Sequence, residues 1–177
     1  MKAAIVAIIF VVTMCASTLG NDVASSLHLS ISMVTGEHSR DSNSTTTNLT
    51  LSEGTLVYER TYWGAHAGRR TPEKRRYKLT NDDLSRLIAL LNQSDLWQTK
   101  TISKPPQQKG TSFYFELTIR ADLKDKQSSI SIDGSCSVSD WQDDPTYQKA
   151  VSLIDELYRV MRRTDPGLAR PQLIETN

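Results

Sequence analysis

Apolar and polar residues alternate strictly just after an apolar N-terminal segment. The apolar positions of this run are Leu27, Leu29, Ile31 and Met33. A period of two is typical of a strand that buries one face. Two further runs with strand character cover residues 49–51 and 56–62, and the turn sequence SEGT separates them. This region therefore predicts three strands.

The alternation returns later in the chain. Tyr77 and Leu79 mark a returning strand, and the strongest pattern of all covers residues 113–120. Its apolar positions are Phe113, Phe115, Leu117 and Ile119. After the turn sequence ADLKDKQ, Ile130 and Ile132 mark the partner strand. Alternating strands joined by tight turns predict an antiparallel sheet of about five or six strands with one apolar face.

Two segments show the helical period instead. The first begins at Thr80, which with Asp83 has the spacing of a capping box, and the second begins at Asp144 and Pro145. The apolar stripes are Leu84, Leu87, Ile88 and Leu91 in the first, and Tyr147, Val151, Ile154, Tyr158 and Met161 in the second. We therefore predict an α+β fold with both amphipathic helices packed on one face of the sheet.

Three arginines, Arg159, Arg162 and Arg163, end the second helix. Cations at a helix C-terminus complement the helix dipole, and this interpretation is favoured over a binding patch.

A nearly uninterrupted apolar run, AAIVAIIFVVTMCA, follows Lys2. It is too short to span a bilayer comfortably, and small residues follow it, which is typical of a signal peptide. We expect residues 1–20 to be removed on export, giving a secreted or periplasmic protein without a membrane span. Two alternatives stay open: an uncleaved anchor, and a lipid anchor on Cys15, which the bulky Met14 before it disfavours.

The length of 177 residues favours one domain. We expect it to cover residues 21–164, followed by a flexible tail over residues 165–177. Loss of the signal peptide removes Lys2 and lowers the formal net charge from +1 to 0. A neutral protein has no global attraction for nucleic acid or anionic membranes, so neither is an expected partner.

No motif predicts catalysis, a metal site or a cofactor. The three histidines are isolated and have no zinc-ligand spacing. Cys136 is the one cysteine beyond the signal peptide, so no intramolecular disulfide is expected. A nucleophilic pair of Cys136 with His66 would need spatial contact and a third, orienting group, so a hydrolase is the least favoured interpretation. We expect a protein that is not an enzyme.

The stretch YWGAHAGRR, residues 62–70, is the most indicative of function. Seven basic residues against two acidic ones give residues 59–78 a local net charge of +5. Aromatic and arginine side chains dominate protein-binding hot spots, and glycines let a loop approach a partner closely. The expected contact residues are Tyr62, Trp63, His66, Arg69 and Arg70. The alternative is a structural turn with both aromatics capping the core; an exposed Trp63 would favour binding, and a buried one would favour a structural role.

Residues 56–161 resemble emfourin-type inhibitors of thermolysin-like metalloproteases. The stretches that carry the resemblance are YWGAHAG, LSRLIALLNQSDLW and FYFELTIRADLKDKQSSISIDG. The strands predicted within residues 27–51 are an addition, and the loop matches no family signature residue by residue, so no inhibitory residue is assigned. The resemblance implies a non-enzymatic binding domain with a protease as partner. A cell-envelope structural or assembly protein is the alternative.

Overall fold

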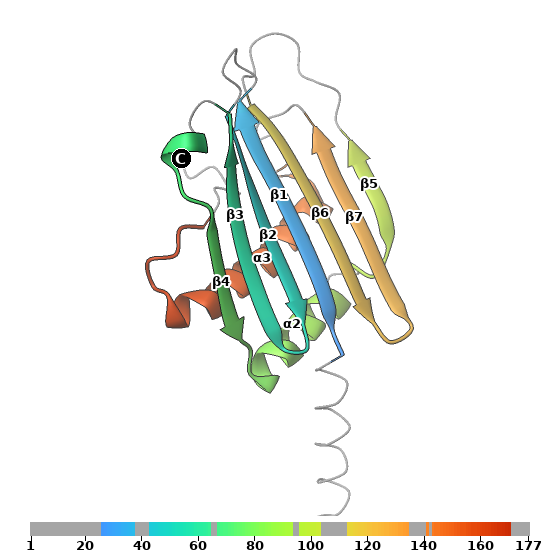
Figure 1. Cartoon of the computed structure of the whole chain (residues 1–177). Coiled ribbons are helices and arrows are strands. Elements are labelled where there is room, and N and C mark those ends of the chain that lie inside the picture. The colour runs from blue at the N-terminus through green and yellow to red at the C-terminus, as the bar shows by residue number, and fades with distance from the viewer. Residues whose placement is uncertain are drawn as a thin grey trace, which may run out of the picture.

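The computed structural model describes residues 26–37, 43–64, 67–93, 96–103, 113–134, 141 and 143–170. They form an α+β fold in which two helices cover one face of a seven-stranded sheet (Figure 1). The strands are β1 (His28–Glu37), β2 (Ser44–Ser52), β3 (Thr55–Trp63), β4 (Glu73–Lys78), β5 (Thr99–Ser103), β6 (Phe113–Leu123) and β7 (Lys126–Gly134). The helices are α2 (Asn81–Gln93), α3 (Pro145–Thr164) and the short 3-10 turn η1 (Ala67–Arg69).

The strand order is β4-β3-β2-β1-β6-β7-β5. All neighbours pair antiparallel except β5, which runs parallel to β7. The predicted antiparallel sheet of five or six strands is therefore wrong in two respects: the sheet has seven strands and is mixed. The missed strand is β5, whose sequence TKTIS contains a single apolar residue and so shows no alternation.

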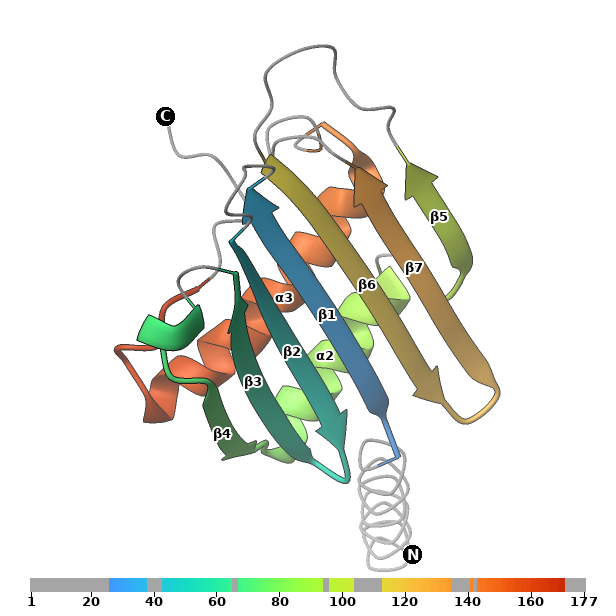
Figure 2. The ribbon, with the colours of Figure 1, turned by 45° about the horizontal axis from the view of Figure 1, so that its top comes forward.

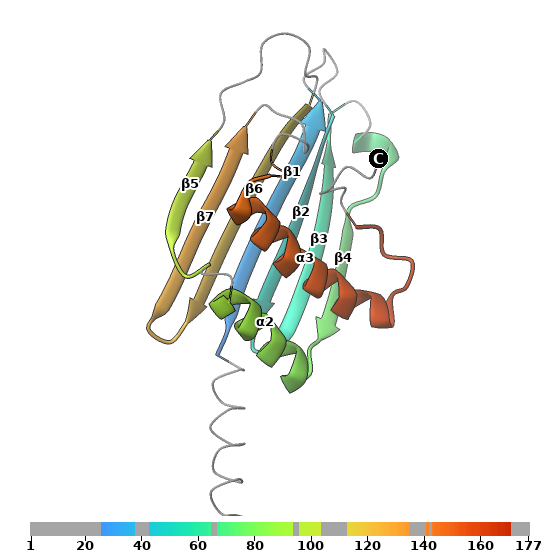
Figure 3. The ribbon, with the colours of Figure 1, turned by 180° about the vertical axis from the view of Figure 1, so that it is seen from behind.

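The predicted alternation correctly identifies the buried face. The apolar residues of β1, β6 and β7 that are at most 2% exposed are Leu29, Ile31, Met33, Phe115, Leu117, Ile119, Ile130 and Ile132. Seen from behind, α2 and α3 cross the face of the sheet that these residues line (Figure 3). Phe115 of β6 meets Tyr147 of α3 edge to face, with ring centroids 5.7 Å apart. The side chain of Phe113 lies outside the described part of the chain.

Local signals in the sequence set the ends of the elements as predicted. The turn between β2 and β3 places Glu53 at φ 50° and Gly54 at φ 67°, the left-handed conformation of a two-residue hairpin. At the start of α2, Thr80 N–H donates to Asp83 Oδ2 (2.9 Å) and Asp83 N–H donates to Thr80 Oγ1 (3.2 Å), which confirms the capping box. Asp144 caps α3 by accepting from two backbone N–H groups.

The arginines at the end of α3 do more than complement the helix dipole. Arg163 Nη2 lies 2.5 Å from Asp83 Oδ2, and Arg159 Nη2 lies 3.5 Å from Asp83 Oδ1. The side chain of Asp83 is only 2% exposed. Burial alone raises the pKa of Asp83, but hydrogen bonds from Thr80 and Arg163 outweigh it and lower the pKa to about 2. The ion pairs of Asp83 with Arg159 and Arg163 therefore join the start of α2 to the end of α3.

We expect Asp83→Asn to lower the free energy of unfolding by about 1–3 kcal/mol near neutral pH, because it removes hydrogen bonds to a charged group. The folded-state pKa of about 2 lies below the ordinary value of 3.8. The stabilisation is therefore fully present above about pH 4 and is lost as the pH falls through about 2. Urea titrations at several pH values should show the difference from wild type shrinking in acid. The exposed neighbour Asp82→Asn is the control, and an equal loss in both variants would contradict the assignment.

The first residues of the predicted flexible tail pack on the domain. Leu168 is 3% exposed and belongs to the core, and its carbonyl accepts from Arg162 Nε at 3.0 Å. Arg170 Nη2 pairs with Asp155 Oδ1 at 2.6 Å. The predicted domain end at residue 164 is therefore too early, because an apolar side chain beyond the helix returns to the core. Residues 171–177 lie outside the described part.

Within the described residues, neither helix is long and apolar enough to cross a membrane. The expected signal peptide and Cys15 lie outside those residues.

Candidate functional site

The predicted site is the connection between β3 and β4, at one edge of the sheet. Figures 1 and 2 show η1 standing beside β3 and β4, away from the two long helices. Ala67 N–H donates to the carbonyl of Gly64 (3.0 Å), and Arg70 N–H donates to that of Ala67 (3.3 Å). Gly64 adopts a φ of 90°, in the left-handed region that favours glycine. The backbone after β3 thus turns sharply at Gly64.

Trp63 is the one large hydrophobic side chain that is exposed in the described part of the chain, at 59%. It ends β3 opposite Ser44 of β2. By the alternation along β3, it belongs to the face of the sheet that the helices leave uncovered. The alternative in which Trp63 caps the core is therefore wrong.

Tyr62 is braced at the base of this connection. Its hydroxyl donates to Glu73 Oε1 at 3.0 Å, and the Arg70 guanidinium lies over its ring, 5.3 Å from the centroid. Glu73 Oε2 in turn accepts from Arg75 Nη2 at 3.1 Å. These contacts join the two ends of the connection, so Tyr62 and Arg70 are already positioned relative to each other in the free protein.

Much of the positive charge counted in the sequence is used inside the domain. Arg60 Nη2 donates to the carbonyl of Ala169 at 3.1 Å. Arg75 pairs with Glu73 and Asp165, and Lys74 pairs with Glu59. Glu59 and Glu73 are already counted in the +5, but Asp165 adds a further negative charge beside the segment, so its positive surface is smaller than the count suggests. Lysines along an edge strand such as β4 also hinder pairing with another chain.

The structure brings together two of the five predicted contact residues, Tyr62 and Arg70. Trp63 follows Tyr62 in β3, so by the alternation its side chain lies on the opposite face of the sheet. His66 and the side chain of Arg69 lie outside the described part, and so does Cys136. In the described part, no group of three or more His, Cys, Asp or Glu residues could hold a metal ion.

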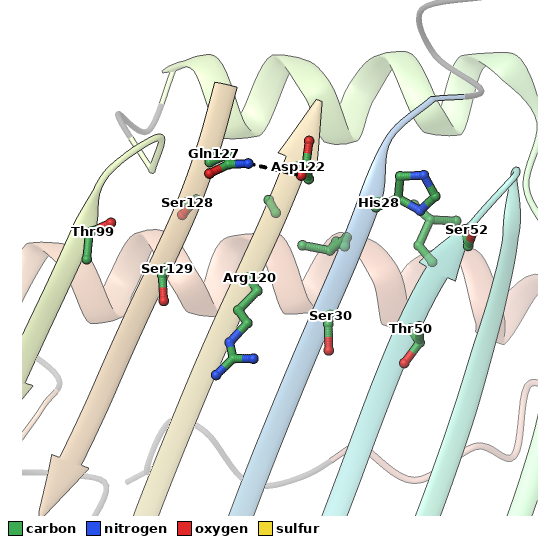
Figure 4. Close-up of a pocket in the computed structure, with 13 residues that line it drawn as sticks. His28, Ser30, Thr50, Ser52, Thr99, Arg120, Asp122, Gln127, Ser128 and Ser129 are labelled. Carbon is green, nitrogen blue, oxygen red and sulfur yellow. Dashed lines mark hydrogen bonds between the residues drawn. The ribbon is translucent and has the colours of Figure 1, made fainter. Parts of the chain in front are cut away.

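A hollow of about 510 Å³ on the uncovered face of the sheet is the feature that the sequence analysis missed. Figure 4 shows its polar side chains on strands β5, β7, β6, β1 and β2, with both helices behind the sheet. The labelled lining residues are His28, Ser30, Thr50, Ser52, Thr99, Arg120, Asp122, Gln127, Ser128 and Ser129. The available signal was the high share of serine and threonine at the outward strand positions.

A second hollow, of about 440 Å³, lies beside the C-terminal half of α3. Four arginines line it: Arg159, Arg162, Arg163 and Arg170. Each already contacts an acidic side chain or a backbone carbonyl of the domain. Burial raises the pKa of Asp155, which also lines the hollow, although Arg170 and Arg162 counteract the effect. The engaged arginines make this a structural cluster.

No family model matches the chain, and the comparison with curated proteins finds no sequence match.

Proposed function

We propose that this protein is an exported, non-enzymatic binding domain that contacts a protein partner through the β3–β4 connection. The observation that carries the proposal is the exposure of Trp63 at the end of β3, next in the chain to Tyr62, which contacts Arg70. A tryptophan that is solvated in the free protein buries a large area on binding, with few rotatable bonds to immobilise. The contacts of Tyr62 with Glu73 and Arg70 also order the two ends of the connection before association, which reduces the conformational entropy lost there.

The resemblance to emfourin-type inhibitors supports a protease as the partner. A thermolysin-like metalloprotease is therefore the first protein to test against the mature chain. A role in cell-envelope structure or assembly remains the alternative, but its expected mark, a buried Trp63, is not observed.

The test is affinity capture from the extracellular or envelope fraction of the native source, with wild-type and Trp63→Ala proteins as parallel baits. A protein that the wild type retains and the variant loses supports the proposal. Any captured protease is then assayed with and without the domain, which separates inhibition from binding alone. Identical sets of captured proteins would contradict a role for this connection.

We also propose that export removes the N-terminal segment. The expected mature N-terminus is near Asn21, because small residues precede it after the apolar run. Intact-mass measurement of the native protein checks this. A chain that still begins at Met1 would overturn it, and a lipid on Cys15 would replace export with anchoring.

A further inference from the structure

The hydroxyl-rich hollow on the uncovered face has no part in the proposed function. Its centre is a row of side chains that stand directly opposite one another on five adjacent strands. The members in order are Thr50, Ser30, Arg120, Ser129 and Thr99. Because neighbouring strands lie about 4.8 Å apart, the row extends about 19 Å across the sheet. It consists of four hydroxyls with one guanidinium at the centre.

A second row lies two residues away along each strand and holds larger polar side chains. His28 stands opposite Asp122, and Asp122 stands opposite Gln127. Gln127 Nε2 donates to Asp122 Oδ2 at 3.4 Å, a long hydrogen bond on an exposed surface. On the other side of the central row, the outward residues are Asn48, Ser32, Thr118, Ser131 and Thr101. The polar surface thus continues on both sides of the central row, and it is rich in hydroxyls on the side of Ser32 and Thr118.

Arg120 is exposed and has no ion-pair partner among the residues that the structure describes. Its cross-strand neighbours Ser30 and Ser129 have short side chains, so the larger Arg120 side chain has open space on both sides (Figure 4). An arginine is charged at every physiological pH and matches a carboxylate with two parallel hydrogen bonds.

We propose that this hollow binds an acidic saccharide, with a sugar carboxylate on Arg120 and sugar hydroxyls on the flanking rows. Serine and threonine hydroxyls both donate and accept hydrogen bonds, as sugar hydroxyls do, and Asp122 accepts. Two other classes of ligand fit less well. The rows contain no aromatic or aliphatic anchor of the kind that dominates protein interfaces, and nucleic acid would require several cations where the hollow offers one.

The test is calorimetric or NMR titration of the mature protein with an oligouronate, with a neutral oligosaccharide of equal length, and with inorganic sulfate. We expect the oligouronate to bind with a Kd below about 1 mM and the neutral sugar to bind at least about tenfold more weakly. Arg120→Gln should remove that preference, and Ser30→Tyr, which fills the hollow, should abolish binding. Lys124→Gln, on the turn between β6 and β7, is the matched control and should bind like wild type.

Equal binding of acidic and neutral sugars, an unaffected Arg120→Gln, or no saccharide binding at all would overturn the proposal. Sulfate binding as tight as that of the oligouronate would reduce the site to an anion contact and also overturn it. If the wild type forms a dimer that Ser30→Tyr dissociates, and no saccharide binds, the uncovered face would be assigned to contact with a second copy of the chain. Trp63→Ala should leave the titration unchanged, so failure of this proposal and failure of the β3–β4 contact are distinguishable.

Discussion

Replacing Phe115 with alanine is expected to lower the free energy of unfolding by about 3–5 kcal/mol. Phe115 is 1% exposed on β6, an interior strand of the sheet, and its ring packs edge to face on Tyr147 of α3. Truncation would leave a cavity between the sheet and the helix, and close packing limits how far the neighbours can fill it. Urea titration with an unchanged m-value measures the loss.

The matched control is Thr118→Ala. Thr118 lies on the same strand but on the uncovered face, so its truncation leaves no cavity and should cost less than about 1 kcal/mol. A loss below about 1 kcal/mol for Phe115→Ala, or equal losses for both variants, would mean that the two faces of β6 are assigned wrongly.

The faces of the long strands and the ends of the helices were predictable because their signals are local. Leu29 and Ile31 alternate with polar residues and are buried as expected, and Thr80 and Asp83 cap α2 at the predicted positions. By contrast, β5 has too few apolar residues to show a period. It takes its place at the sheet edge through pairing with β7, which no pattern within TKTIS reveals.

Contacts between residues that lie far apart in the chain could not be predicted from the sequence. The sequence identifies Asp83 as a helix-capping residue, but its contact with Arg163 exists only because α3 packs against α2. The hollow has the same origin. Ser30 and Ser129 are ordinary outward residues of two strands, and they flank Arg120 only because β6 lies between β1 and β7. Sheet order, which the sequence did not predict, therefore builds this surface.

The β3–β4 connection was predictable from its composition but not in its internal contacts. Its aromatic and basic residues marked it as a surface, and Trp63 is exposed. The charge count overstated the positive surface because Arg60 and Arg75 are used within the domain. Trp63 is thus a stronger argument for binding than the local charge.

Replacing Trp63 with alanine is expected to weaken partner binding by about 2 kcal/mol or more, which is about 30-fold in Kd, with little change in melting temperature. The side chain is 59% exposed in the free protein, so its loss removes contact area without opening the core. Arg70→Ala should chiefly slow association, and more so at low salt, because charges at the rim of an interface steer encounter.

Trp97 provides the matched tryptophan control. It is partly buried against the core, and its Nε1 donates to Asn92 Oδ1 at 2.8 Å. Trp97→Ala should therefore lower the melting temperature while the folded protein keeps its affinity. The two tryptophans separate loss of binding from loss of stability.

The most direct test of the central claim pairs thermal melts with binding kinetics for the wild type, Trp63→Ala and Trp97→Ala, against the captured partner. If the β3–β4 connection is the contact surface, Trp63→Ala melts like the wild type and dissociates about 30-fold faster. A Trp63→Ala protein that melts at a sharply lower temperature while binding with wild-type affinity would show instead that Trp63 is a structural residue, and the proposed contact would be wrong.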